Sequence, residues 1–178
     1  IKNDLKKIEF RGPDNLSVKK YNNSVYLAHL RLSIIDLDKR SNQPYEFDNL
    51  TITYNGEIYN FLTIKNELIS QGYVFETESD TEVLVKAYHA WGENMLGKLN
   101  GMFAFAILDL KQKQLFCARD RIGIKPFYYV SNDKEFLFAS DVTSLIASSC
   151  YAPKMNWENV IAGYAFQGAL RPNTVYDN

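Results

Sequence analysis

The chain has 178 residues and a net charge of −1, and 46% of its residues are hydrophobic. These values are typical of one soluble globular domain, which at this length buries roughly 70% of its unfolded surface without help from metals or disulfides. The near-zero charge argues against a nucleic-acid-binding or polybasic membrane surface, and no apolar run could span a membrane. The two cysteines, Cys117 and Cys150, form no metal-ligand cluster, which favours a reducing compartment.

The N-terminal third of the chain alternates predicted strands with turns. A short helix is expected around Leu5–Ile8, and strands are expected over Ser24–Ala28, Leu32–Ile35 and Leu50–Thr53, where β-branched and aromatic residues gather. The dipeptide Asn55-Gly56 follows the last of these strands and readily adopts positive φ. We therefore predict a tight turn there, at the end of the strand.

Two helices are predicted after this turn. Apolar residues recur at helical spacing over Phe61–Ile69, and Gln71-Gly72 is a typical helix end. Tyr73–Thr77 is a short strand candidate. Ser79–Glu82 then has the form of a capping box, in which Ser79 accepts an N–H and Glu82 reaches back. It predicts the start of a second helix that ends at Gly92.

The second half of the chain is rich in predicted hairpins. Met102–Leu108 is almost wholly apolar and alternates large residues with alanine, which favours a strand buried on both faces. The other predicted elements are strands over Leu115–Ala118, Phe127–Val130 and Phe136–Ala139, and helices over Val142–Ala147 and Trp157–Phe166. Together these elements predict an α+β fold with a core of two antiparallel sheets and helices outside.

Several short motifs occur in one order along the chain. They are Arg11–Asp14, Arg31–Asp36, Tyr54–Asn60, Ser79–Glu82, Leu99–Ala106 and Arg119–Pro126. Their order and spacing resemble the glutaminase domain of glutamine-dependent asparagine synthetase, a class II glutamine amidotransferase with an N-terminal-nucleophile (Ntn) hydrolase fold. The resemblance covers roughly residues 5–170, and several motifs in register are far more specific than one motif alone.

The resemblance implies a four-layer αββα sandwich of two antiparallel sheets, and we expect its first strand to be missing from this chain. It implies one domain over residues 1–178, with residues 151–178 leading toward an absent C-terminal, ATP-dependent synthetase domain. The implied reaction is hydrolysis of the glutamine side-chain amide to glutamate and ammonia, for asparagine synthesis in the cytoplasm. No cofactor is implied for this half-reaction, whereas ATP and Mg would serve only the synthetase domain. The implied partners are glutamine and that domain, and a homodimer stays open.

The resemblance also assigns residues to one end of the substrate. Arg31 resembles the arginine that binds the α-carboxylate of glutamine, a task for which a planar guanidinium is suited because it can contact both oxygens. The implied substrate-binding set includes the neighbouring residues Leu32, Ser33, Ile34 and Ile35. The alternative for Arg31 is an ordinary ion pair, and the alternative for the two isoleucines is core packing.

The remaining implied site residues follow the predicted Asn-Gly turn. Asn55 and Gly56 resemble an oxyanion hole, which stabilises the tetrahedral intermediate through a side-chain amide and a backbone N–H. Glu57 and Asp80 resemble the acceptors of the glutamine α-ammonium. Asp80 could instead cap the following helix, and both roles can coexist in one carboxylate. The motif Arg119–Pro126 is interpreted as a structural bend.

The sequence departs from the family at its start. The family nucleophile is an N-terminal cysteine whose own α-amine acts as the base, and this chain begins at Ile1. Neither Cys117 nor Cys150 has a free α-amine, so we expect the chain as given to be inactive. Phe10 stands where the family usually has histidine, and His29 is interpreted as a core or edge residue. Two alternatives remain, namely a non-catalytic glutamine-binding or scaffolding relative, and a glutaminase domain that serves a sugar or phosphoribosyl acceptor.

Overall fold

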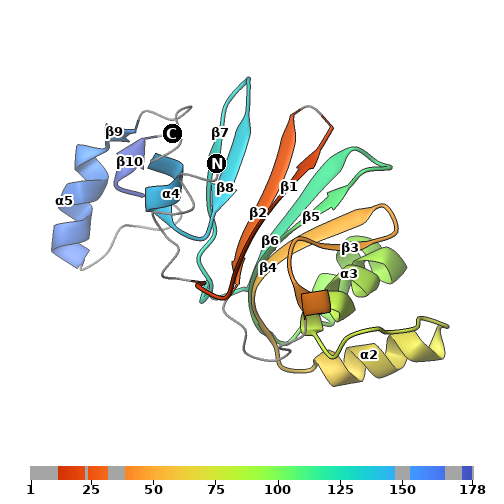
Figure 1. Ribbon diagram of the computed structural model, residues 1–178. Helices are drawn as coiled ribbons and strands as arrows, with labels where there is room; N and C mark the ends of the chain where they lie inside the picture. The colour runs from red at the N-terminus through yellow and green to blue at the C-terminus, as the bar shows by residue number, and fades with distance from the viewer. Residues whose placement is uncertain (1–11, 23, 32–38, 147–152, 167–173, 178) are drawn as a thin grey trace. The chain divides into compact units, whose positions relative to one another are not determined.

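The computed structural model describes residues 12–22, 24–31, 39–146, 153–166 and 174–177 (Figure 1). The chain divides into two compact units, of which one lies within Lys2–Phe127 and the other comprises mainly Tyr128–Asn178. The predicted elements Leu5–Ile8 and Leu32–Ile35 lie outside the described residues. The single-domain assignment stays a prediction.

The first unit contains two antiparallel sheets. The larger has four strands in the order β3-β4-β5-β6, and the smaller is a hairpin of two. The strands of the larger sheet are β3 (Tyr45–Phe47), β4 (Leu50–Ile58), β5 (Gly101–Asp109) and β6 (Gln114–Arg119). The hairpin is formed by β1 (Asn15–Tyr21) and β2 (Val25–Arg31). The expected α+β class with antiparallel sheets is confirmed.

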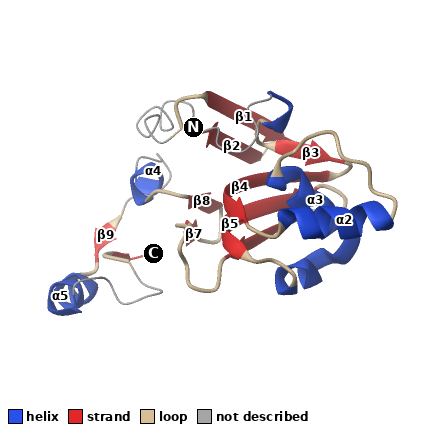
Figure 2. Ribbon diagram, turned by 90° about the horizontal axis from the view of Figure 1, so that it is seen from below, coloured by secondary structure: helices blue, strands red, loops and turns tan. Residues whose placement is uncertain are grey.

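Two helices pack on one face of the four-stranded sheet (Figure 2). They are α2 (Phe61–Ser70) and α3 (Asp80–Trp91), accompanied by the 3-10 helices η2 (Lys39–Ser41) and η3 (Gly92–Gly97). The core between α3 and the sheet includes Ile52, Tyr54, Ile58, Phe103, Phe105, Val83 and Leu84. The predicted helix ends at Gln71-Gly72 and Gly92 are confirmed.

The opposite face of β4 and β5 carries smaller side chains. Thr53 pairs with Ala106, and Asn55 pairs with Ala104, so these residues share a face. Thr53, Ala104 and Ala106 are buried as well. The prediction that the strand Met102–Leu108 is buried on both faces is therefore confirmed.

The second unit consists of short elements. A hairpin of β7 (Tyr128–Ser131) and β8 (Phe136–Ala139) precedes α4 (Val142–Ile146). Strands β9 (Lys154–Met155) and β10 (Tyr176–Asp177) pair with each other, and α5 (Trp157–Phe166) stands between them in the sequence. The predicted hairpin and helices are confirmed within the described residues. In the described part of the chain, no helix combines the length and apolar character that crossing a membrane requires.

The predicted turn at Asn55-Gly56 is wrong, because β4 continues through both residues to Ile58. Gly56 pairs with Phe103 in β5, and a Cβ atom at Gly56 would lie only 2.2 Å from the Met102 carbonyl oxygen. The glycine therefore permits close approach of two strands rather than a reversal of the chain. The chain turns after Ile58 instead.

The predicted strand over Tyr73–Thr77 is also wrong. The N–H groups of Glu76 and Thr77 donate to the Glu82 carboxylate, at 3.0 and 2.8 Å, instead of to a neighbouring strand. The predicted capping box is present only in part, because the Glu82 carboxylate does not bond to Ser79. Ser79 is the N-cap, since its Oγ accepts from the Thr81 N–H at 3.2 Å, but Glu82 reaches past Ser79 to the preceding loop.

Candidate functional site

Three of the predicted site residues, Asn55, Gly56 and Glu57, lie together near the end of β4. Side chains alternate along a strand, so Asn55 and Glu57 point away from the face on which Tyr54 and Ile58 pack against α3. All three residues are partly exposed, whereas the preceding residues of β4 are buried. Within the described part of the chain, neither Asn55 nor Glu57 uses its side chain in a hydrogen bond or ion pair. Their amide and carboxylate groups are thus available to a ligand.

Arg31 is the last residue of β2 and is only 8% exposed. Its Nη1 donates to Oδ1 of Asn42 at 2.6 Å, and its carbonyl oxygen accepts from the N–H of Asp14 at 3.1 Å. A Cβ atom on Gly12 would lie 2.4 Å from the carbonyl carbon of Leu30. Gly12 therefore packs against the peptide that positions Arg31. Leu32, Ser33, Ile34 and Ile35 lie outside the described residues.

Asp80 is the first residue of α3 and is 4% exposed. Its Oδ2 accepts from the Tyr54 hydroxyl at 2.7 Å and from the Ile58 N–H at 3.1 Å. The helix cap is Ser79, so the carboxylate of Asp80 chiefly joins α3 to β4. These two hydrogen bonds place Asp80 beside the backbone of the segment that carries Asn55, Gly56 and Glu57.

The electrostatics of Asp80 reflect this position. Burial raises the pKa of Asp80, hydrogen bonds from Tyr54 and Ile58 lower it, and the negative charge of Glu57 raises it again, with a net increase. Asp80 and Glu57 are therefore close enough to repel. A cation bound near both carboxylates would relieve that repulsion and favour their ionised forms.

Replacing Asp80 with asparagine is expected to raise the thermal unfolding midpoint at pH 7. Because the pKa of Asp80 is raised in the folded protein, ionisation costs stability as the pH rises above the ordinary value of 3.8. An amide oxygen in the place of Oδ2 can keep both hydrogen bonds and removes the charge. Each kcal/mol gained corresponds to about 2–4 °C in a chain of this size. Calorimetry at pH 7 tests this, and a midpoint of Asp80→Asn at or below that of the unmodified protein contradicts it.

The matched control is Asp80→Ala, which removes the charge and the acceptor together. It leaves the buried Tyr54 hydroxyl and the Ile58 N–H without their partner, and unpaired buried donors destabilise a protein by about 1–3 kcal/mol each. We expect its midpoint to fall, so the two variants separate the charge of Asp80 from its hydrogen bonds.

His29 is a strand residue with one hydrogen bond, as predicted. Its Nε2 lies 3.1 Å from the carbonyl oxygen of Tyr54, and because a carbonyl only accepts, Nε2 carries the proton. Burial lowers the pKa of His29 to about 4. Nδ1 is buried and has no hydrogen-bond partner among the described residues. The imidazole is therefore neutral near pH 7.

Tyr54 and Gln43 are polar partners within the site region that sequence reasoning missed. Gln43 Oε1 accepts the Tyr54 N–H at 2.6 Å, across eleven positions of sequence. No local spacing pattern marks such a pair, because the contact exists only once β4 has formed. Two signals do lie in the sequence, since Tyr54 opens the motif Tyr54–Asn60 and Gln43 directly precedes Pro44.

The motif Arg119–Pro126 forms a bend, as predicted, and Asp120 ties it to Phe103 of β5. The Arg119 guanidinium donates to the carbonyl of Gly123 at 2.6 Å, and the Asp120 carboxylate accepts from the N–H groups of Ile124 and Lys125 at 2.9 and 3.0 Å. Elsewhere, burial raises the pKa of Cys117 to about 11, so its thiol is protonated and inert near pH 7. Cys150 lies outside the described residues.

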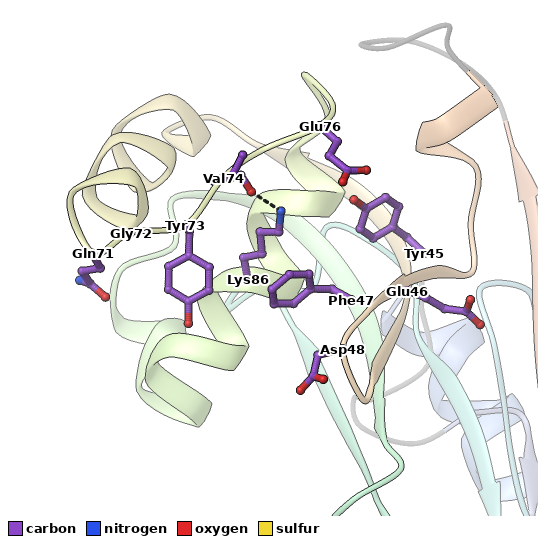
Figure 3. A pocket seen from close by; sticks show the side chains of 10 residues that line it. All are labelled: Tyr45, Glu46, Phe47, Asp48, Gln71, Gly72, Tyr73, Val74, Glu76 and Lys86. Atoms are coloured by element: carbon purple, nitrogen blue, oxygen red, sulfur yellow. Dashed lines mark hydrogen bonds between the residues drawn. The ribbon is translucent and has the colours of Figure 1, made fainter.

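A cavity of about 660 Å³ is lined by residues of β3, of the loop between α2 and α3, and by Lys86 of α3 (Figure 3). None of the predicted site residues lines it. Several polar groups in its wall are already paired within the protein. Lys86 Nζ donates to the Val74 carbonyl at 2.6 Å and binds Glu82, and Glu46 accepts from Tyr21 at 2.6 Å. We therefore interpret the cavity as a groove of the scaffold and place the candidate site at the end of β4.

The fold is that of the Ntn glutamine amidotransferases. The structure of glutamine phosphoribosylpyrophosphate amidotransferase from B. subtilis matches with a TM-score of 0.66 and 22% identity, covering 80% of this chain and 39% of that chain. A structure described as the allosteric regulatory enzyme of purine biosynthesis matches with a TM-score of 0.55 and 24% identity, over 67% of this chain and 28% of that one. At these identities the likeness concerns the fold.

The family profile described as glutamine amidotransferase domain matches residues 1–178, and the chain belongs to this family. Asparagine synthetase [glutamine-hydrolyzing] 3 of Bacillus subtilis is 43% identical over 141 residues, which are 77% of this chain and 23% of that protein. A putative asparagine synthetase [glutamine-hydrolyzing] 2 of Methanocaldococcus jannaschii is 36% identical over 194 residues, covering 97% of this chain and 37% of that protein. The chain thus spans well under half the length of these relatives.

Proposed function

We propose that this chain is the glutaminase domain of an asparagine-synthetase-like enzyme, which hydrolyses the side-chain amide of glutamine to glutamate and ammonia. The observation that carries the proposal is the end of β4, where the Asn55 amide and the Glu57 carboxylate are available and the N–H of Ile58 donates to the buried Asp80. Such a set of groups suits a small zwitterion with a distal carbonyl. Membership of the glutamine amidotransferase family supports glutamine as that molecule.

The two ends of the amino-acid part of glutamine would be bound by opposite charges. The Arg31 guanidinium would bind the α-carboxylate through charge-assisted hydrogen bonds. It already engages the Asn42 side-chain oxygen, which fixes its orientation. Glu57 is the accessible acceptor for the α-ammonium, and the buried Asp80 supports it from α3. Leu32, Ser33, Ile34 and Ile35 would complete the wall beside the carboxylate.

Catalysis would take place at the distal amide. In the complete protein, the thiol of an N-terminal cysteine would attack the amide carbon while its α-amine, with a pKa of about 8, takes the proton. The Asn55 amide and the Gly56 N–H would donate to the oxyanion of the tetrahedral intermediate. The same proton then goes to the departing nitrogen as ammonia, and water cleaves the thioester to release glutamate and restore the thiol.

The acceptor of the ammonia is proposed from the relatives. Both asparagine synthetases named above are much longer than this chain, which is compatible with a further domain. In our proposal that domain is C-terminal, uses ATP and Mg, and receives the ammonia. A sugar or phosphoribosyl acceptor is the second candidate, and the higher identity to asparagine synthetases disfavours it. A non-catalytic glutamine-binding role is the third. We propose a cytoplasmic enzyme.

Substituting Arg31 tests the proposal in the complete protein. Arg31→Ala is expected to raise the glutamine KM by about tenfold to a hundredfold, because a charge-assisted hydrogen bond contributes about 1.5–3 kcal/mol. Arg31→Lys keeps the charge without the planar fork and is expected to recover only part of this loss. Glutamate release at varied glutamine concentration measures both variants. An unchanged KM in Arg31→Ala would remove Arg31 from the site.

The control for both variants is asparagine synthesis with ammonia supplied directly. Free ammonia bypasses the glutamine site, so this activity should persist in Arg31→Ala. If the unmodified protein releases glutamate but makes no asparagine from aspartate and ATP, the proposed acceptor is wrong and the glutaminase assignment stands.

A further inference from the structure

Tyr54 precedes the proposed oxyanion residue Asn55, and each of its three polar groups binds a side chain from a different part of the fold. Its N–H donates to Oε1 of Gln43 at 2.6 Å, and its carbonyl accepts from Nε2 of His29 at 3.1 Å. Its hydroxyl donates to Oδ2 of Asp80 at 2.7 Å. These partners come from the segment before β3, from β2 and from α3. Tyr54 itself is 5% exposed.

The sheet register explains why two of these bonds exist. Strand β3 pairs with β4 only as far as Tyr45 opposite Ile52, so among the described residues no strand pairs with that edge of β4 beyond Ile52. The N–H and C=O of one strand residue point to the same edge, and the side chains of Gln43 and His29 supply the hydrogen bonds there. The peptide groups of Tyr54 are thereby fixed directly before Asn55.

Two of the hydrogen-bond partners of Tyr54 are also neighbours of Arg31 or of its partner Asn42 in the sequence. His29 lies on β2, two residues before Arg31, and Asn42, which accepts from the Arg31 guanidinium at 2.6 Å, is the neighbour of Gln43. Gln43 also donates to Oγ1 of Thr81 on α3 at 3.3 Å. The residues proposed to bind the carboxylate, the ammonium and the oxyanion are thus connected through Tyr54 and its partners.

We propose that Tyr54 is a positioning residue for the glutamine site, whose hydroxyl holds the Asp80 carboxylate in the orientation that receives the α-ammonium. The inference rests on the proposed function. The hydroxyl and the ring of Tyr54 have separable tasks. Its Cε2 lies 2.9 Å from where a Cβ of Gly56 would be, so the ring fills the space left by the glycine. Phenylalanine can fill that space equally well, and only the hydroxyl can bind Asp80.

Loss of the hydroxyl has a consequence for the charge of Asp80. Its hydrogen bond lowers the pKa of Asp80 against burial and the charge of Glu57, which raise it. The titratable groups that act on Asp80 among the described residues are Tyr54 and Glu57, both from β4. Without the hydroxyl, Asp80 becomes protonated at higher pH, and a neutral acid attracts an ammonium far less.

The test is Tyr54→Phe in the complete protein, assayed for glutamate release between about pH 5 and pH 9. We expect the glutamine KM to rise about tenfold, kcat to change less than about twofold, and the acid limb of kcat/KM to move to higher pH. The matched control is Tyr88→Phe. Tyr88 is a buried tyrosine of α3 whose hydroxyl binds Gln114 at 3.1 Å, and its removal should leave KM and the acid limb unchanged.

A double-variant cycle with Asp80→Asn separates positioning from general loss of stability. If the hydroxyl acts through the Asp80 carboxylate, Tyr54→Phe should shift KM much less in the Asp80→Asn background than alone. Equal shifts in both backgrounds, or an unchanged KM and acid limb in Tyr54→Phe, would overturn the inference and leave the glutaminase assignment intact. An unmodified protein that neither binds glutamine in calorimetry nor hydrolyses it would overturn both.

Discussion

Replacing Asn55 with alanine in the complete protein is expected to lower kcat for glutamine hydrolysis by about a hundredfold to a thousandfold, the usual cost of losing one oxyanion donor. Glutamine affinity should change little, because the amide is needed when negative charge develops on the carbonyl oxygen. In this variant an effect on catalysis can be separated from an effect on stability. Asn55 is partly exposed and its side chain bonds to no other described residue, so its removal should hardly affect stability.

The kinetic analysis of Asn55→Ala compares kcat with KM for glutamate release. The matched control is Asn60→Ala, whose amide has a structural task, since it donates to the Lys98 carbonyl at 2.9 Å and accepts from the Asn100 N–H at 2.9 Å. Asn60→Ala should affect thermal stability and leave kcat within a few-fold. If Asn55→Ala instead raised KM and left kcat unchanged, Asn55 would be a docking group only.

Replacing Glu82 with leucine is expected to destabilise the domain by about 3–5 kcal/mol, the cost of leaving a buried charge without its partner. Glu82 is fully buried and accepts from Thr77 Oγ1 at 2.7 Å and from the Thr77 N–H at 2.8 Å, besides its ion pair with Lys86. Lys86 is itself 3% exposed, and its ammonium lies 4.8 Å from the ring centroid of Phe47. Without Glu82, that buried ammonium loses its counter-ion and keeps the Val74 carbonyl and the rings of Phe47 and Phe75 as neighbours.

The same carboxylate predicts how stability depends on pH. Burial raises the pKa of Glu82, but hydrogen bonds from Lys86, Thr77 and Glu76 lower it by a larger amount. The pKa of Glu82 in the folded protein therefore lies below its ordinary value of 4.5. The stability contributed by Glu82 is therefore complete above pH 4.5 and is lost as the pH falls through the lowered value. The unfolding midpoint of the unmodified protein should fall more steeply in that acid range than that of Glu82→Leu.

The control for Glu82→Leu is Glu67→Gln. Glu67 pairs with Lys98 at 2.7 Å, but both side chains are 41% exposed, and exposed pairs contribute about 0–1 kcal/mol. Denaturant unfolding of the two variants should thus differ by several kcal/mol. A cost below about 1 kcal/mol for Glu82→Leu would show that the buried pair is dispensable.

Local patterns sufficed where local physics decides the structure. The helical spacing that starts at Phe61 predicted α2, and the alternation in Met102–Leu108 predicted a strand buried on both faces. They failed where a distant partner decides. Asn55-Gly56 has the composition of a turn, but pairing with β5 keeps it in a strand. Tyr73–Thr77 has strand composition, but Glu82 takes its N–H groups.

The candidate site shows the same division. Arg31, Asn55, Glu57 and Asp80 are proposed from motifs that lie within short stretches of sequence, and their roles stay predictions. The function of Tyr54 could not be proposed in this way, because its three bonds reach partners that come close only in the folded protein.

The absence of a side chain at Gly12 affects the position of Arg31. The backbone of Leu30 and Arg31 lies so close to Gly12 that even a methyl group would have to displace the end of β2. Residue 12 can therefore govern where a guanidinium lies without carrying any chemistry of its own. In a map of mutational tolerance, this glycine would stand out as strongly as a ligand-binding residue, because steric exclusion rather than contact restricts it.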